Sequence, residues 1–178
     1  MAAAVTGPII KLNNGVEMPA LGFGTFANEG IKGETHKAVI AALNAGYRHL
    51  DCAWFYLNED EVGSGMREFL AANPTVKRSD IFITTKVWNH LHEPEDVEWS
   101  LKNSLERLQT PYVDGFLVHW PIAAEKNEDR TVKVGADGKV TSPKKLPPQF
   151  SANANLVYHQ EGTHRKSRAN MASDGIFV

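Results

Sequence analysis

The sequence predicts an α/β fold in which parallel strands alternate with helices. Two observations favour this class. After a hairpin-like opening, a strand-like run followed by a helix-like run occurs three times, and a fourth strand-like run ends at His119. Polar side chains stand at the downstream ends of three of these strands. Because helical crossovers join parallel strands in right-handed βαβ units, a doubly wound sheet and a (β/α) barrel both fit this order.

Turn residues and helical spacing mark the N-terminal elements. Two short apolar runs flank Asn13–Gly15, which predicts a small β-hairpin, and a first core strand is expected over Ala20–Thr25. The alanine-rich stretch Glu34–Asn44 is followed by Gly46, a common helix stop, and is predicted to be helical. His49–Asp51 then begins the next short strand.

A second helix is predicted after Asn58, which with Glu61 resembles a capping box. Its apolar residues recur at helical spacing until Asn73 and Pro74 break the run. The apolar positions are Val62, Met66, Phe69 and Leu70.

The remaining elements are a buried strand, a helix and a last strand. Ile81–Val87 is a continuous β-branched and aromatic run, typical of a strand that is buried on both faces. Pro94 suits the first turn of a third helix, and Val113–His119 is the fourth strand. The third helix carries Val97, Leu101, Leu105 and Leu108 on one face.

The pattern changes after Pro121. Residues 123–139 are polar and predict a long loop, and residues 141–178 show no strand or helix pattern. We therefore divide the chain into an N-terminal part, residues 1–140, and an unrelated, disordered tail, residues 141–178.

Composition limits the classes of partner. The formal net charge is −2 and the charges are interspersed, so no basic stripe for nucleic acid and no polybasic membrane patch is present. No apolar run approaches the roughly 20 residues of a membrane span. Cys52 is the only cysteine, which excludes an intrachain disulfide and fits a reducing, cytoplasmic location. His90 and His92 lack a further ligand at fixed spacing, so we expect no metal site.

The candidate active site is the set Asp51, Tyr56, Lys86 and His119. Each residue alone has an ordinary structural explanation: a cap, a packing tyrosine, a solvated lysine or a core histidine. However, the carboxyl ends of neighbouring parallel strands meet at one mouth. A phenol, whose unperturbed pKa is about 10, is a poor acid at neutral pH, but a nearby ammonium favours the phenolate. The set therefore indicates proton transfer to a carbonyl group.

Four motifs, LGFGT, GYRHLDCAWFYLNEDEVG, TTKVW and LVHWP, make the chain resemble the aldo-keto reductase family from about residue 9 to residue 139. The resemblance implies a (β/α)₈ TIM barrel with an N-terminal hairpin, monomeric in its full-length form, that reduces an aldehyde or ketone with NADPH. It implies that Tyr56 donates the proton, Lys86 assists it, Asp51 holds Lys86, and His119 orients the carbonyl oxygen.

The resemblance also assigns binding residues. Gly24, Thr25 and Asp51 match cofactor-binding positions. The predicted substrate-binding residues are Phe26, Trp88, His119 and Trp120. Phe26 stands where many family members carry tryptophan, and the family's groups for the carboxamide and the 2′-phosphate, which follow the fourth strand, are not found.

Four strands are too few for a closed barrel, which typically needs about 250 residues. The sequence therefore predicts an incomplete barrel with an N-terminal hairpin and about four βα units, whose open edges favour self-association. An alternative to the reductase function is a catalytically inert truncated fragment, or an interaction product, that lacks most of the cofactor site.

Overall fold

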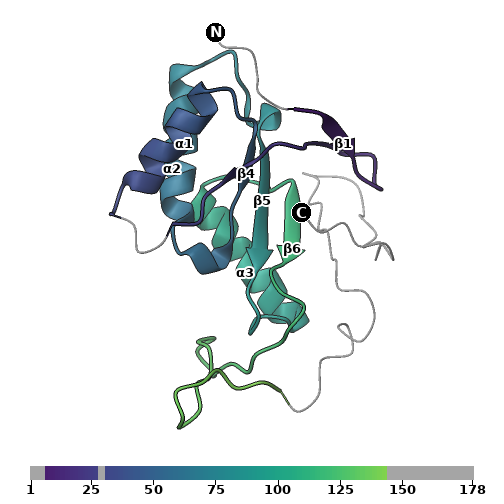
Figure 1. The fold of residues 1–178 in the computed structure, drawn as a ribbon, viewed down its shortest axis with the longest axis vertical. Coiled ribbons are helices and arrows are strands. Elements are labelled where there is room, and N and C mark those ends of the chain that lie inside the picture. The colour runs from purple at the N-terminus through teal and green to yellow at the C-terminus, as the bar shows by residue number, and fades with distance from the viewer. Residues whose placement is uncertain (1–6, 28–30, 144–178) are drawn as a thin grey trace.

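A computed structural model describes residues 7–27 and 31–143 (Figure 1). The predicted tail, residues 141–178, falls outside these residues except for its first three, so the proposed division of the chain stays a prediction.

The chain begins with the predicted hairpin. β1 (Ile9–Lys11) pairs antiparallel with β2 (Glu17–Pro19), and Gly15 between them has a φ of 86°, a value that glycine adopts without strain. The hairpin lies near the starting ends of the other strands (Figure 1), where the Pro19 carbonyl contacts the His49 ring at 3.0 Å.

Four parallel strands form the main sheet in sequence order. They are β3 (Phe23–Gly24), β4 (His49–Asp51), β5 (Phe82–Val87) and β6 (Gly115–Val118). A doubly wound sheet reverses its strand order at a switch point, so this order favours the barrel alternative. β3 is shorter than the predicted Ala20–Thr25 because only Phe23 and Gly24 find partners on the short strand β4.

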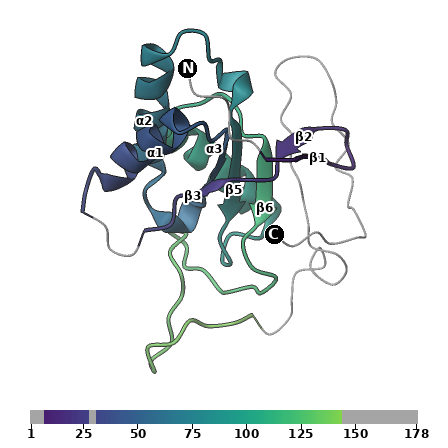
Figure 2. The same ribbon diagram turned by 45° about the horizontal axis from the view of Figure 1, so that its top comes forward.

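All three helices follow the predicted boundaries closely. The helices are α1 (Glu34–Asn44), α2 (Glu59–Ala72) and α3 (Pro94–Leu108), all labelled in Figure 2. α2 packs against both α1 and α3. Two 3₁₀ turns, η1 (Trp54–Tyr56) and η2 (Arg78–Asp80), connect the elements. The core lies between helices and sheet and includes Val39, Leu43, Leu50, Val62, Met66, Phe69, Ile83, Leu108 and Phe116.

Two glycines allow α2 to approach both neighbouring helices. A Cβ atom on Gly63 would stand 2.4 Å from the carbonyl oxygen of Leu108, and one on Gly65 would stand 2.7 Å from that of His36. Real Cβ atoms do not approach backbone so closely, so the absence of a side chain sets the helix spacing at these two points.

The predicted capping box is wrong. Asn58 is the N-cap of α2 but makes no side-chain cap; its amide instead donates to the Thr25 carbonyl and the Thr35 hydroxyl, at 2.8 and 3.2 Å. Glu61 turns to α1, where its carboxylate accepts the backbone N–H groups of Gly33 and His36. Both side chains therefore make tertiary contacts, which local spacing does not reveal.

The fully buried face of α3 is largely polar. The predicted apolar residues Val97, Leu101 and Leu105 are only partly buried, although they pack against the core. By contrast, the side chains of three polar residues of this helix are fully buried: Asp96, Ser100 and Ser104.

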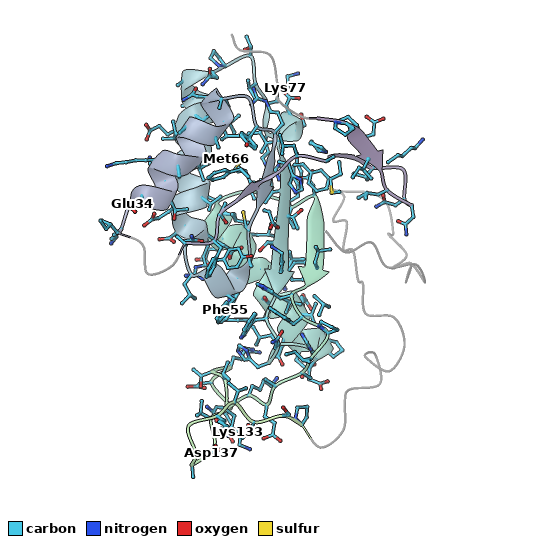
Figure 3. The ribbon with its side chains drawn as sticks, in the orientation of Figure 1. Glu34, Phe55, Met66, Lys77, Lys133 and Asp137 are labelled. Carbon is cyan, nitrogen blue, oxygen red and sulfur yellow. The ribbon has the colours of Figure 1, made fainter. Side chains whose placement is uncertain are left out.

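The predicted loop after β6 folds onto the start of α3. Its residues Lys126 and Arg130 both form ion pairs with Asp96, and Arg130 also lies over the ring of Trp99. Figure 3 shows Lys133 and Asp137 where this loop extends away from the sheet. Asp96 can be buried because it has two cationic partners.

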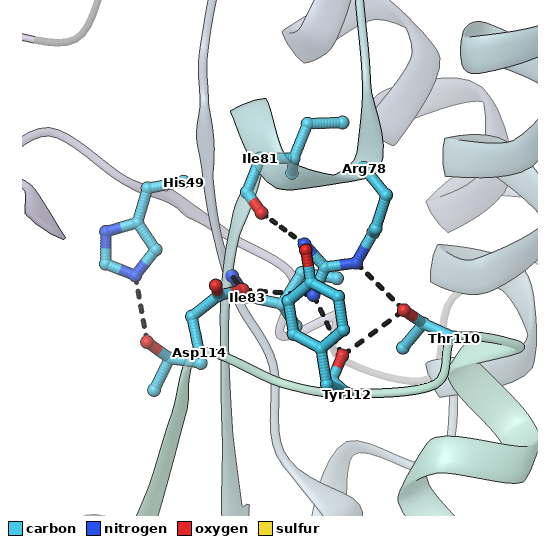
Figure 4. Close-up of polar contacts among 8 residues, drawn as sticks. His49, Arg78, Ile81, Ile83, Thr110, Tyr112 and Asp114 are labelled. Carbon is cyan, nitrogen blue, oxygen red and sulfur yellow. Dashed lines mark hydrogen bonds and ion pairs between the residues drawn. The ribbon is translucent and has the colours of Figure 1, made fainter. Parts of the chain in front are cut away.

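A clamp around Arg78 joins the starting ends of the strands (Figure 4). Its guanidinium donates to the carbonyls of Ile81 and Tyr112, to the Thr110 hydroxyl at 2.8 Å, and to Asp114 at 3.0 Å. The Asp114 carboxylate also accepts the Ile83 N–H at 2.9 Å.

Within the described residues, no helix combines the length and apolar character that a membrane crossing requires. The same part of the chain has no group of three or more His, Cys, Asp or Glu side chains arranged to hold a metal ion.

Candidate active site

The four predicted residues lie together at the carboxyl ends of the strands. Asp51 ends β4, Lys86 is the fifth residue of β5, and His119 directly follows β6. Tyr56 ends the 3₁₀ turn η1 between β4 and α2. The structure thus brings all four to one edge of the sheet, from three strands and one connection.

Lys86 is the centre of the set. Its Nζ donates to Asp51 Oδ1 at 2.6 Å and to the Cys52 carbonyl at 2.8 Å, and it lies 3.5 Å from the Tyr56 hydroxyl. The Lys86 side chain is 14% exposed and that of Asp51 is 40% exposed. An ammonium has three donors, so Asp51 and the carbonyl fix two and the third is directed to the phenol.

The His119 ring lies next to both the Tyr56 ring and the Trp88 ring. Its ring centre is 5.6 Å from that of Tyr56 and 4.8 Å from that of Trp88, with nearly perpendicular planes. Burial, followed by the positive charge of Lys86, lowers the pKa of His119 to about 4, although Asp51 opposes the shift. The ring is therefore neutral at pH 7 and carries one N–H that can donate.

Two exposed aromatic side chains lie next to the rings of Tyr56 and His119. Phe26 is exposed and meets the Tyr56 ring edge-on at 5.1 Å. Trp120 is 52% exposed and lies parallel to the His119 ring at 6.4 Å. Phe26 therefore lies beside Tyr56 and Trp120 lies beside His119, whereas the contact of these residues with a substrate stays a prediction.

Phe55 is a site residue that the sequence interpretation missed. Its ring stacks on Trp88 with centres 3.7 Å apart and planes 11° apart, yet it is exposed (Figure 3). The only signal in the sequence was an aromatic residue directly before the candidate proton donor. Stacking makes Trp88 and Phe55 one apolar surface beside His119.

The predicted cofactor residues have different surroundings. The N–H and the hydroxyl of Thr25 both donate to the Asp51 carbonyl at 3.0 Å, so Thr25 ties the ends of β3 and β4 together. Gly24 is exposed, and a Cβ placed on it would meet no atom within 4 Å. The structure therefore leaves Gly24 uncovered next to Asp51, and cofactor binding by these residues stays a prediction.

The arrangement can move a proton. A phenol that loses its proton here has an ammonium beside it to stabilise the anion, and a neutral imidazole can hold an acceptor oxygen in place. The aromatic surface provides an apolar wall for the rest of a small molecule.

Comparisons with known proteins point in the same direction. The model of the Aldo/keto reductase family matches residues 20–144. The NADP(+) glycerol 2-dehydrogenase of Hypocrea jecorina is 72% identical over 128 residues, which are 72% of this chain and 40% of that protein. The D/L-glyceraldehyde reductase of the same organism is 45% identical over 96% of this chain and 49% of that protein.

Solved structures show the same likeness. The aldose reductase of Schistosoma japonicum aligns with a TM-score of 0.73 and 36% identity, over 81% of this chain and 46% of that one. The Bombyx mori aldo-keto reductase in complex with NADP aligns with a TM-score of 0.65 and 38% identity, over 74% and 43% of the two chains. The chain spans less than half the length of the proteins it matches.

Proposed function

The chain belongs to the aldo/keto reductase family, and we propose that it reduces an aldehyde or ketone to an alcohol with NADPH. The observation that carries the proposal is the position of Lys86, which bridges Asp51 and the Tyr56 hydroxyl at 2.6 and 3.5 Å. The names of the relatives support NADP(H) as the cofactor.

Tyr56 would donate a proton to the carbonyl oxygen while the carbonyl carbon accepts a hydride, which is what NADPH supplies when bound. The two transfers balance: the hydride forms a C–H bond, the C=O double bond becomes a C–O single bond, and the electron pair left on oxygen takes up the proton to form the O–H bond. Lys86 would stabilise the phenolate that remains, and solvent would return the proton. Asp51 would hold the Lys86 side chain in place, since Asp51 Oδ1 and Lys86 Nζ are 2.6 Å apart.

His119 would hold the carbonyl oxygen next to the phenol. Because its pKa is about 4, it stays neutral and donates one hydrogen bond without competing as an acid. Gly24 and Thr25, beside Asp51, would lie at the nicotinamide end of the cofactor; this is supported by Gly24, where an added Cβ would meet no atom within 4 Å.

Small carbonyl compounds are the proposed substrates. Two relatives are named for glycerol and glyceraldehyde, which differ by one oxidation step. The exposed aromatic side chains Phe26, Phe55 and Trp120 would bound the space into which such a molecule enters.

We further propose a cytoplasmic location, supported by the free, buried thiol of Cys52. The 178-residue chain is also expected to self-associate, because β3 and β6 each have one strand neighbour within the described residues. A sedimentation coefficient that does not change with concentration and matches a monomer would contradict self-association.

The function is tested by NADPH oxidation with glyceraldehyde, using the purified chain and two tyrosine variants. Tyr56→Phe should reduce turnover at least about a hundredfold, the usual contribution of a general acid. Tyr112→Phe is the matched control, because that ring lies over Arg78 at the other end of the strands and should leave turnover unchanged. No NADPH binding and no turnover by the parent chain would favour the inert alternative, and full turnover by Tyr56→Phe would contradict the assigned role.

A further inference from the structure

Glu59 is a fully buried carboxylic acid for which the proposed reaction has no use. It is the first residue of α2, three positions after Tyr56, and its relative exposure is 0%. Its Oε1 accepts a hydrogen bond of 2.6 Å from the Thr85 hydroxyl. Burial raises the pKa of Glu59, and the Thr85 hydrogen bond opposes this shift. Burying a carboxyl group lowers the stability of the fold unless its hydrogen bonds compensate, so Glu59 is expected to have a specific role.

Thr85 directly precedes Lys86 on β5. Successive side chains of a strand point to opposite faces of the sheet, so Thr85 faces the helices and Lys86 faces the site. Glu59 therefore bonds to Thr85 on the helix-facing side of β5, and Asp51 bonds to Lys86 on the side that faces the site.

The adjacent residue, Asn58, forms a similar hydrogen bond to the end of β3. Its amide donates to the carbonyl of Thr25 at 2.8 Å, and Thr25 in turn donates to the Asp51 carbonyl. The segment that carries Tyr56 is thus fastened to the end of β3 by one residue and to β5 by the next.

We propose that Glu59 is a positioning residue that sets the distance between the Tyr56 phenol and the Lys86 ammonium through its hydrogen bond to Thr85. This role deepens the proposed function and rests on it for the importance of the phenol–ammonium pair. The geometric claim is separate, because the environment of Lys86 can be measured without turnover.

The first measurement is the rate at which an amine-acylating reagent modifies Lys86, followed by peptide mass spectrometry under native conditions. The exposed Lys102 is the internal reference. Thr85→Val, which removes only the donor, should accelerate Lys86 modification about tenfold, the order expected for loss of one buried hydrogen bond. Thr85→Ser keeps the hydroxyl and should stay within about twofold of the parent.

Two further variants separate positioning from general loss of stability. Val39→Ala removes buried atoms from the core between the helices and should lower stability without accelerating Lys86 modification. Glu59→Asp shortens the acid by one methylene and should accelerate Lys86 modification as much as Thr85→Val does. This second variant keeps the test decisive if Thr85→Val does not fold. Equal modification rates in Val39→Ala and Thr85→Val would overturn the proposal.

Turnover supplies the second readout. If the parent chain reduces carbonyl compounds, Thr85→Val should lower kcat more than it changes KM, because substrate binding is retained while proton donation is misaligned. A parent chain without turnover would refute the proposed function, but the modification rates of Lys86 would still decide the role of Glu59.

Discussion

The clamp around Arg78 allows a quantitative prediction for the end of the sheet opposite the candidate site. Arg78→Met keeps most of the aliphatic stem and removes the guanidinium. Asp114 then retains only the Ile83 N–H, and the carbonyls of Ile81 and Tyr112 lose a charged donor. The change leaves a nearly buried carboxylate without its cation.

The expected loss follows from burial. Removing one partner of a buried ion pair costs about 3–5 kcal/mol, whereas exposed pairs contribute about 0–1 kcal/mol. The Arg78 and Asp114 side chains are 15% and 18% exposed, so we expect a loss of about 3 kcal/mol, at the lower end of the buried range. Arg78→Lys should recover only part of it, because one ammonium cannot reproduce the planar fork.

Urea unfolding followed by tryptophan fluorescence measures this loss. Arg67→Met is the matched control, since Arg67 is exposed on α2 and its replacement should change the free energy of unfolding by at most about 0.5 kcal/mol. A loss below about 1 kcal/mol in Arg78→Met, with an unchanged m-value, would refute the argument that the clamp holds the strand ends together.

Two other predictions concern His119 and Gly63. The folded-state pKa of His119, about 4, lies below its ordinary value of 6.5, so the unfolded chain binds more protons between these values. The free energy of unfolding should therefore fall as pH is lowered from 6.5 towards 4, and His119→Asn should reduce the slope of this pH dependence. An NMR titration of the His119 ring with a midpoint near pH 6.5 would contradict the prediction. Gly63→Ala should lower the free energy of unfolding by about 1–3 kcal/mol, because the added Cβ would meet the Leu108 carbonyl. The control Gly24→Ala, whose Cβ would meet no atom within 4 Å, should lower it little. Equal losses in the two variants, measured by urea unfolding, would contradict the prediction.

The order and type of the elements could be predicted because burial repeats regularly along them. Helix α1 has its predicted boundaries, Glu34–Asn44, and β5 differs from the predicted strand by one residue. The sequential strand order could not be deduced, since right-handed crossovers are compatible with both a doubly wound sheet and a barrel. The polar face of α3 was missed because serines and Asp96 read as solvent-facing until their partners are known.

The site was predictable where strand ends converge. Asp51, Lys86 and His119 lie at or within one residue of the ends of successive parallel strands, so topology alone brings them to one edge. Phe55 and Glu59 were not found, because their roles depend on tertiary contacts with Trp88 and Thr85. The incorrect capping box has the same cause: short-range spacing does not show that a side chain has a better partner elsewhere.

The proton-donating part of the candidate site is held by neighbouring elements alone. Every described contact of the Lys86 ammonium comes from Asp51 at the end of β4 or from the segment that follows it, up to Tyr56. Formation of this arrangement therefore requires the pairing of β4 with β5, and it does not require a closed barrel. It follows that the geometry of the phenol–ammonium pair and the grip on a cofactor are separable properties. Modification of Lys86 reports the first property and NADPH binding reports the second, so a chain can possess one without the other.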